Sequence, residues 1–461
     1  MIKTYKFFFI IAFVLLTGVN LQAQKYGIES KTLENGLDVI VITNPAVPLV
    51  TVEIDVKNGA YTESPEYDGL SHLYEHMFFK ANSIIPNQEA YMERLRELGA
   101  TFNGTTSEER VNYFITAPKD SLEESVQFIY DAITSPLFLE EELVKERPVV
   151  TGEYDRNEAN PFFHLNKAVT QKVWWKYYSR KNVIGDRDVI LSTPPEKMRI
   201  IQHRFYIPNN SALILAGDVT PDEGFALAEK IFSKWERGED PFKKYKIPEH
   251  PPIPEIEVVV VKQPVNAITL EYMWHGPSVG KDPKSTYAAD VLSFILGQQT
   301  SKFHKNLVES GLSFGVNFGY YTLNHVGPIT LFAQTSPEKF DACQKAVFEE
   351  LERMIDPNYF TDEQLENAKT ILAINEQYAR ERASQFAHTV GFWWAVAGLD
   401  YYMNYLDNLK KVSREDIKNF LETYVMDKPY VLGVLVSPEE AEKVELILNI
   451  KEGELKDETS N

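Results

Sequence analysis

The 461-residue sequence contains a single cysteine, Cys343. One cysteine excludes an internal disulfide, so the fold cannot depend on such a bond even in an oxidising compartment. Cys343 lies in a helical pattern over residues 340–351, where we expect it to be a small buried side chain. The remaining composition, 44% hydrophobic and 25% charged, is that of a globular protein large enough to form two or three hydrophobic cores.

Positive charge is also scarce, with 47 lysines and arginines against 67 aspartates and glutamates and a formal net charge of −20. A surface of this sign argues against nucleic acid or an anionic membrane as the partner. It does not identify a substrate, although an acidic cavity would favour basic peptides.

Long apolar runs are few, and the longest covers residues 7–16. This run is short for a membrane span, which needs about 20 residues. It follows Lys3 and Lys6 and precedes Ala23, a small residue suited to cleavage, so residues 1–23 are predicted to be a signal peptide. The alternative, an uncleaved membrane anchor, is disfavoured by the length of the run. We therefore expect a mature protein that is periplasmic or secreted and has no membrane span.

The first half of the mature chain mixes strand and helix patterns. The predicted strands are 36–42, 49–56, 101–106, 111–116 and 212–216, and the predicted helices are 69–80, 89–98, 122–133 and 140–156. A further helix, ending near residue 205, is predicted to begin with a capping box formed by Thr193 and Glu196.

Much of this pattern recurs after a stretch rich in proline and charge at 237–254, which is predicted to be a linker. The recurring elements are strands at 255–262 and 267–274, a helix at 285–296, a helix capped by Ser413 and a strand at 430–436. The segments 219–223 and 436–440 both read V-[ST]-P-[DE]-E.

Such recurrence predicts an internal duplication, the alternative being chance repetition of common caps and turns. The expected fold is α+β, with two homologous domains, each a mostly antiparallel sheet packed with helices. Their predicted bounds are 24–236 and 255–450, and residues 451–461 are predicted to form a disordered tail.

The chemistry of the chain is indicated by H-x-x-E-H at residues 72–76. On a helix, His72 and His76 are four residues apart and Glu75 is three from His72, so all three project from nearly one face. Two imidazoles on one face can hold a zinc ion, and a carboxylate beside them can serve as general base. This order of residues is the inverzincin motif.

A zinc hydrolase needs a third protein ligand and one open coordination position. The charged helix predicted at 140–156 and its extension supply four candidate acids, and spacing alone does not choose among them. These candidates are Glu146, Glu153, Asp155 and Glu158.

The sequence resembles the pitrilysin-like zinc peptidases, a family that includes insulin-degrading enzyme and mitochondrial processing peptidase. The segments that carry the resemblance are 72–80 (HLYEHMFFK), 103–107 (NGTTS) and 146–153 (ERPVVTGE), with weaker support from 205–210 and 217–218. The second copy of the duplicated pattern has no H-x-x-E-H, so the metal motif belongs to the first domain alone.

The resemblance implies a role for each of several residues. It implies that Glu153 is the third zinc ligand beside His72 and His76, that Glu75 is the general base, and that Glu146 is a supporting catalytic acid. It also implies that a peptide substrate lies as an added strand along the segment at Asn103 and Gly104. Simpler alternatives remain, because Glu146 could be a helix-surface acid and Asn103 could serve only a turn.

One departure from the family pattern concerns an arginine and a tyrosine seven residues apart, which complete the site in active members. The corresponding segment here is 307–314, and the two positions are Leu307 and Phe314, neither of which can donate a hydrogen bond from its side chain. We therefore expect a zinc peptidase subunit that pairs with a homologous chain carrying Arg and Tyr, a heterodimer rather than a homodimer. The alternatives are a non-catalytic chamber or scaffold subunit and a zinc-binding module without hydrolysis.

Overall fold

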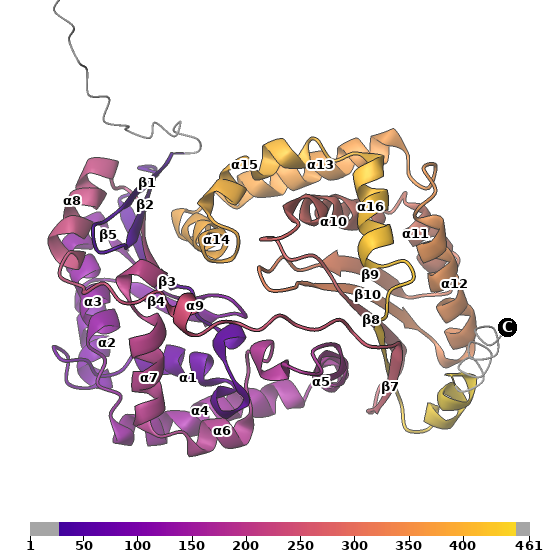
Figure 1. The fold of residues 1–461 in the computed structure, drawn as a ribbon, viewed down its shortest axis with the longest axis horizontal. Helices are drawn as coiled ribbons and strands as arrows, with labels where there is room; N and C mark the ends of the chain where they lie inside the picture. Colours follow the sequence, from indigo (N-terminus) through magenta and orange to yellow (C-terminus); the bar gives the residue numbers. More distant parts are fainter. Residues whose placement is uncertain (1–26, 449–461) are drawn as a thin grey trace, which may run out of the picture.

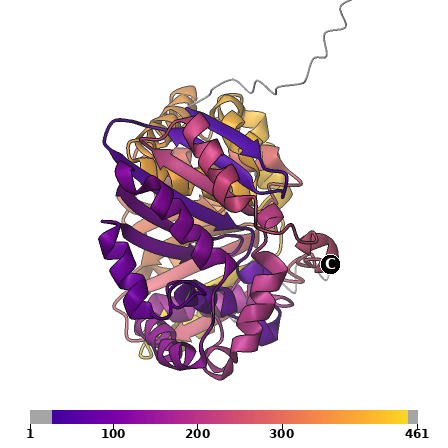
Figure 2. The same ribbon diagram turned by 90° about the vertical axis from the view of Figure 1, so that its left-hand side faces the viewer.

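The computed structural model describes residues 27–448. The predicted signal peptide at 1–23 and the predicted tail at 451–461 lie outside the described residues. The chain forms two halves that lie side by side, each built around one sheet (Figure 1). Turned by 90°, the first half lies in front of the second (Figure 2). Among residues 27–448, no helix has the length and apolar content needed to cross a membrane.

The first sheet has six strands in the order β1-β2-β6-β3-β5-β4. Their bounds are β1 (Ile28–Thr32), β2 (Asp38–Thr43), β3 (Leu49–Val56), β4 (Thr101–Thr106), β5 (Val111–Pro118) and β6 (Ser211–Gly217). Only the β2–β6 pair is parallel, and β4 lies at the free edge. The helices of this half are α1 (Leu70–Phe78), α2 (Gln88–Glu97), α3 (Leu122–Thr134), α4 (Glu140–Glu158), α5 (Pro161–Val173), α6 (Arg187–Ser192), α7 (Pro195–Phe205), α8 (Pro221–Phe232) and α9 (Pro241–Lys244).

The second sheet has five strands in the order β7-β11-β8-β10-β9. Their bounds are β7 (Glu257–Lys262), β8 (Ile268–His275), β9 (Gly315–Tyr320), β10 (Pro328–Thr335) and β11 (Val431–Val436). The helices are α10 (Pro283–Leu296), α11 (Lys302–His304), α12 (Phe340–Arg353), α13 (Asp362–Tyr378), α14 (Ala383–Val396), α15 (Leu399–Leu409) and α16 (Arg414–Tyr424). Cys343 is fully buried in α12, as the sequence predicts.

The two sheets share one topology. Without β1, the first sheet has the order β2-β6-β3-β5-β4, which matches β7-β11-β8-β10-β9 strand for strand in chain order. The single parallel pair is also in the same place, β2 with β6 and β7 with β11. The predicted α+β fold of two homologous, mostly antiparallel domains is therefore confirmed.

The halves exchange one helix each. Helix α5 packs on β7, β8 and β11 of the second sheet, and α14 packs on β3 and β6 of the first. Two glycines allow the close approach, because a Cβ on Gly391 of α14 would lie 2.4 Å from Asp55 Oδ2, and one on Gly433 of β11 would lie 2.3 Å from Val169 Cγ2 of α5. Each sheet is thus covered on one face by its own helices and on the other by a helix of the opposite half. The two halves depend on each other for burial.

Two details differ from the sequence prediction. Thr193 does not cap the start of a helix, because it is the C-cap of α6, which ends at Ser192, and its hydroxyl donates to the Val189 carbonyl. The next helix begins at Pro195 after Pro194, without a side-chain cap. The prediction of a capping box at Thr193 is therefore wrong, because the hydroxyl donates to a carbonyl in the preceding helix instead. The capping box predicted at Ser413 is present. The predicted linker contains a short helix, α9.

In the second half, a half-buried acid, Asp290, lies where the metal motif would be. Helix α10 follows β8 as α1 follows β3, and it carries Tyr287 and Asp290 at the spacing of His72 and Glu75. The hydroxyl of Tyr405 donates to Asp290 Oδ2 at 2.8 Å. Asp290 is the only acid of α10. Burial raises the pKa of Asp290 to about 7.

The raised pKa of Asp290 predicts how the free energy of unfolding depends on pH. The folded state holds this proton up to about pH 7, whereas an unfolded aspartate loses it near pH 4. The free energy of unfolding therefore falls as the pH rises between these values. Asp290→Asn removes the charge and keeps an acceptor for Tyr405, so we expect it to be up to about 4 kcal/mol more stable than wild type at pH 8.

This gain in stability should shrink as the pH is lowered from 8 to 5, which urea unfolding measures directly. Glu363→Gln, at an exposed position of α13, is the control and should show no such trend. Parallel stability curves for Asp290→Asn and wild type would contradict the assignment.

Candidate metal centre

Helix α1 presents the H-x-x-E-H motif on its outer face. Its inner face, which includes Leu73 and Met77, packs into the first core, while His72, Glu75 and His76 stay partly exposed. The start of the helix is fixed by a carboxylate that the sequence analysis missed. Glu63 is buried and accepts hydrogen bonds from the backbone N–H of Gly69 at 2.7 Å and of Ser71 at 2.6 Å.

Helix α4 packs across α1 and brings acids to this face. Glu146 and Glu153 are seven residues apart, two turns of the helix, so both point toward α1. Asp155 pairs with Arg187 instead, and Glu158 is exposed. Of the four acids that the sequence left open, the structure brings only Glu153 to both histidines.

The three residues converge on one point. His72 Nε2 lies 3.6 Å and His76 Nε2 3.8 Å from Glu153 Oε2. One donor atom from each residue lies within 4.8 Å of the other two, and among residues 27–448 no other such trio of histidine, cysteine or acid is found. Two imidazole nitrogens and one carboxylate oxygen form the donor set of a catalytic zinc site with an open position.

The charge state of His72 suits metal binding. Burial, followed by the neighbouring His76, lowers the pKa of His72 to about 4. The ring is therefore neutral at physiological pH, which is the form that ligates a metal. The residues present fit zinc by type and spacing.

Glu75 lies beside the trio and is held by the edge strand β4. The hydroxyl of Thr106 donates to Glu75 Oε2 at 2.7 Å. Gly104 leaves room for the acid, because a Cβ there would lie 2.9 Å from Glu75 Cγ. Burial raises the pKa of Glu75, and the hydrogen bond from Thr106 partly offsets that rise. A carboxylate in this position can accept and return a proton.

Glu146 lies behind His76 rather than beside the open position. Its Oε1 is 2.8 Å from His76 Nδ1, and its Oε2 is 2.6 Å from the ammonium of Lys80. Burial alone would raise the pKa of Glu146, but the hydrogen bonds with His76 and Lys80 outweigh it and lower the pKa. With Nδ1 engaged, His76 turns its Nε2 toward Glu153. The structure thus places Glu146 next to a candidate metal ligand, where it contacts His76 and Lys80.

Lys80 and Thr106 are the site residues that the sequence analysis missed. Lys80 is only 6% exposed although it follows the helix end, and a buried lysine needs an acidic partner. That partner, Glu146, is 66 residues away in the sequence, so local spacing gave no signal. Both residues lie within segments that carry the family resemblance, 72–80 and 103–107, and could have been chosen from them.

Because Lys80 contacts Glu146, which contacts His76, we expect its loss to change the affinity for zinc. Residues that orient a ligating histidine typically change metal affinity by about 10- to 100-fold when lost. We expect Lys80→Met to weaken zinc binding by a factor in this range, measured by competition with a chelator. Lys119→Met, which removes an exposed lysine paired with Asp218, should leave zinc affinity unchanged. Equal affinities for both variants would show that Lys80 does not act on the metal ligands.

The predicted substrate segment is the free edge of the first sheet. Strand β4 pairs only with β5, so its other side can accept a further strand. Gly104 faces Glu75, whereas Asn103 is exposed on the opposite face of the strand. The structure brings Gly104 to the metal centre and does not bring the Asn103 side chain there.

The two positions at which the resemblance implies Arg and Tyr are apolar here and differ in burial. Leu307 is fully buried in the second core, within the π-helical turn η6 (Lys305–Glu309). Phe314 is 63% exposed just before β9. Neither side chain can donate a hydrogen bond to a substrate.

Sequence comparison places both halves in one family. Residues 38–186 match the family described as Insulinase (Peptidase family M16), and residues 194–372 match the domain described as Peptidase M16 inactive domain. An uncharacterized zinc protease of Rickettsia felis is 24% identical over 385 residues, covering 79% of this chain and 87% of the relative. Zinc protease PqqE of Helicobacter pylori is 26% identical over 434 residues, covering 89% and 96%.

Two solved structures share the fold. A protease from Helicobacter pylori superposes with a TM-score of 0.79 at 22% identity, covering 89% of this chain and 99% of the other. The periplasmic protease PqqL from Escherichia coli superposes with a TM-score of 0.70 at 18% identity, covering 90% of this chain and 48% of the other. With an M16 description matched in each half, the chain belongs to the M16, or pitrilysin-like, peptidase family.

Proposed function

We propose that this chain is a zinc-dependent endopeptidase subunit that cleaves peptides or unfolded polypeptides in an enclosed chamber. The observation that carries the proposal is the convergence of His72, His76 and Glu153 on one point. Glu75 lies beside this point, on the helix that carries the two histidines. Relatives described as zinc proteases support the choice of metal.

The reaction follows from the positions of the side chains. Zinc held by His72, His76 and Glu153 would acidify an attacking water molecule and polarise the scissile carbonyl. Glu75 accepts the proton of the water at its carboxylate and then delivers it to the leaving amine. Thr106 holds one oxygen of Glu75, which leaves the other free for this transfer.

The substrate backbone is proposed to add as a strand to the free edge of β4. Main-chain hydrogen bonds to an edge strand give affinity with little demand on the peptide sequence. The same edge carries Gly104 and Thr106 next to Glu75, so a peptide lying along it would pass the general base.

The chain is proposed to act with a homologous subunit that supplies Arg and Tyr. Leu307 and Phe314 leave this chain without a donor for the developing oxyanion at those positions. The complete set of metal ligands favours a catalytic subunit over a non-catalytic scaffold, which would have no use for them.

We also propose that the mature protein is periplasmic or secreted. The support is the pattern of residues 1–23 in the sequence and the description of one structural neighbour as a periplasmic protease. Residues 1–23 lie outside the described part of the chain.

Metal removal tests the proposal. Dialysis against a chelator should abolish peptide hydrolysis, and one equivalent of zinc should restore it. Glu153→Gln should fail to retain zinc, whereas Asp155→Asn on the same helix should bind it as wild type does. A protein that hydrolyses peptides equally well after complete removal of metal would overturn the proposal.

A further inference from the structure

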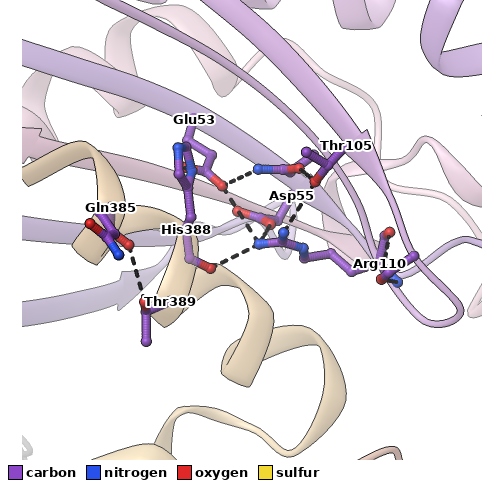
Figure 3. Close-up of polar contacts among 9 residues, drawn as sticks. Glu53, Asp55, Thr105, Arg110, Gln385, His388 and Thr389 are labelled. Carbon is purple, nitrogen blue, oxygen red and sulfur yellow. Dashed lines mark hydrogen bonds and ion pairs between the residues drawn. The ribbon is translucent and has the colours of Figure 1, made fainter. Parts of the chain in front are cut away.

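A second charged cluster lies on the face of the first sheet that α14 covers. It consists of Glu53 and Asp55 on β3, Arg110 before β5, and His388 on α14, and we call it the Glu53–Arg110 cluster (Figure 3). Both acids are 0% exposed and Arg110 is 8% exposed. Buried charges are costly unless paired, so a cluster of this kind calls for an explanation.

The cluster joins the two halves of the chain. His388 Nδ1 lies 2.5 Å from Glu53 Oε2, and Arg110 Nη1 donates to the His388 carbonyl at 2.8 Å. The same Nη1 lies 3.4 Å from Asp55 Oδ1 and 3.8 Å from Glu53 Oε1. Arg110 therefore holds a main-chain group of α14 and both acids of β3 at once.

Arg110 also reaches the edge strand. Its Nη2 donates to Thr105 Oγ1 at 3.3 Å, and the Thr105 hydroxyl donates to Asn112 on β5. Asn112 in turn donates to Glu53 Oε1 at 2.5 Å. Thr105 lies between Gly104 and Thr106, the two residues of β4 that contact Glu75. One face of β4 thus meets the general base while the other is tied to the second half.

The second sheet shows which residues occupy the place of the Glu53–Arg110 cluster in a half without the metal motif. Glu271 pairs with Phe332 as Glu53 pairs with Phe114, so the strands can be matched residue by residue. By this register Met273 replaces Asp55 and Pro328 replaces Arg110.

Only the buried glutamate and one helix contact remain in that half. Asn166, the sixth residue of α5, donates to Glu271 Oε1 at 3.2 Å, as His388, the sixth residue of α14, contacts Glu53. The acid–arginine pair is therefore confined to the half that carries the H-x-x-E-H motif, so packing of the exchanged helix does not require it.

We infer that Arg110 is a positioning residue for peptide binding, which ties the substrate edge β4 to helix α14 of the second half through Thr105. The inference rests on the proposed function, because it takes β4 as the strand along which the peptide lies. Its consequence is that the second half, which has no H-x-x-E-H motif, fixes the edge that the substrate joins.

Thr105→Val tests the inference with little risk to the fold. Thr105 is exposed, and valine keeps the branched shape that suits a strand while it removes the hydroxyl that accepts from Arg110 and donates to Asn112. We expect peptide binding to the zinc-loaded protein in a Glu75→Gln background to weaken about fivefold or more, because the hydroxyl loses its hydrogen bonds with Arg110 and Asn112. Zinc affinity and melting temperature should stay at the parent values.

Thr389→Val is the matched control. Thr389 lies on α14 beside His388, and its hydroxyl donates only to the Gln385 carbonyl of the same helix (Figure 3). This variant should bind peptide as the parent does. If Thr105→Val and Thr389→Val bind peptide equally well, in a protein that binds zinc and peptide, the inference is overturned. The proposed function would stand.

Arg110→Met is the stronger variant. In the active enzyme it should raise KM about tenfold or more and change kcat by less than about threefold, because it alters the binding edge and not the general base. Arg110→Lys should recover part of the loss, since a lysine keeps the charge but not the planar fork. A fall in kcat with unchanged KM would overturn the inference. If the parent protein binds neither zinc nor peptide, the proposed function fails, and the inference fails with it.

Discussion

Glu75→Gln is expected to lower peptide hydrolysis by about 10³-fold or more while the protein keeps its zinc. Glutamine has nearly the same shape and can still accept the hydrogen bond from Thr106, but it cannot take up a proton. The metal ligands His72, His76 and Glu153 are untouched, so metal content should remain at one zinc per chain. Rate and zinc content are measured on the same preparation.

The control for this experiment is Glu89→Gln, which removes an exposed acid of α2. It should retain the wild-type rate. Full hydrolysis by Glu75→Gln would remove Glu75 as general base, and loss of zinc in that variant would place Glu75 among the ligands instead.

The second large effect concerns a homologous partner. The chain alone is expected to hydrolyse peptides slowly, and addition of a homologous chain with Arg and Tyr at the positions of Leu307 and Phe314 should raise kcat about 10²- to 10³-fold. This factor is the usual change in kcat when one hydrogen-bond donor to the oxyanion is removed or added. Titration of a fixed amount of this chain with the partner measures it.

The control partner carries Leu and Phe in place of its Arg and Tyr, which are the residues this chain already has. It should bind this chain without raising the rate. A chain that reaches its full rate without any partner would contradict the pairing proposal and would require a donor from within this chain.

The family and the α+β architecture could be predicted from the sequence because their signals are local. His72, Glu75 and His76 lie within one turn and a half of helix, so their spacing alone shows that they share a face. The repeated order of strands and helices likewise predicted the duplication. The matching strand orders of the two sheets confirm it.

Contacts between distant segments could not be predicted in the same way. The resemblance pointed to Glu146, but nothing in the sequence paired it with Lys80, and only the packing of α4 against α1 brings both residues to His76. The exchange of α5 and α14 is a property of the assembled domains, so His388 gave no signal that it contacts Glu53, 335 residues away.

The error at Thr193 has a local cause. A hydroxyl next to proline and three residues before a glutamate is typical of a helix start. The same hydroxyl can instead close the preceding helix, and here it bonds to Val189, four residues earlier.

The most direct test of the central proposal is a crystal structure of the zinc-loaded protein with anomalous data collected on both sides of the zinc absorption edge. The proposal requires one anomalous peak in contact with His72 Nε2, His76 Nε2 and a carboxylate oxygen of Glu153, at distances of about 2.0–2.2 Å. A peak bound by other residues, or no peak in crystals grown with excess zinc, would contradict it.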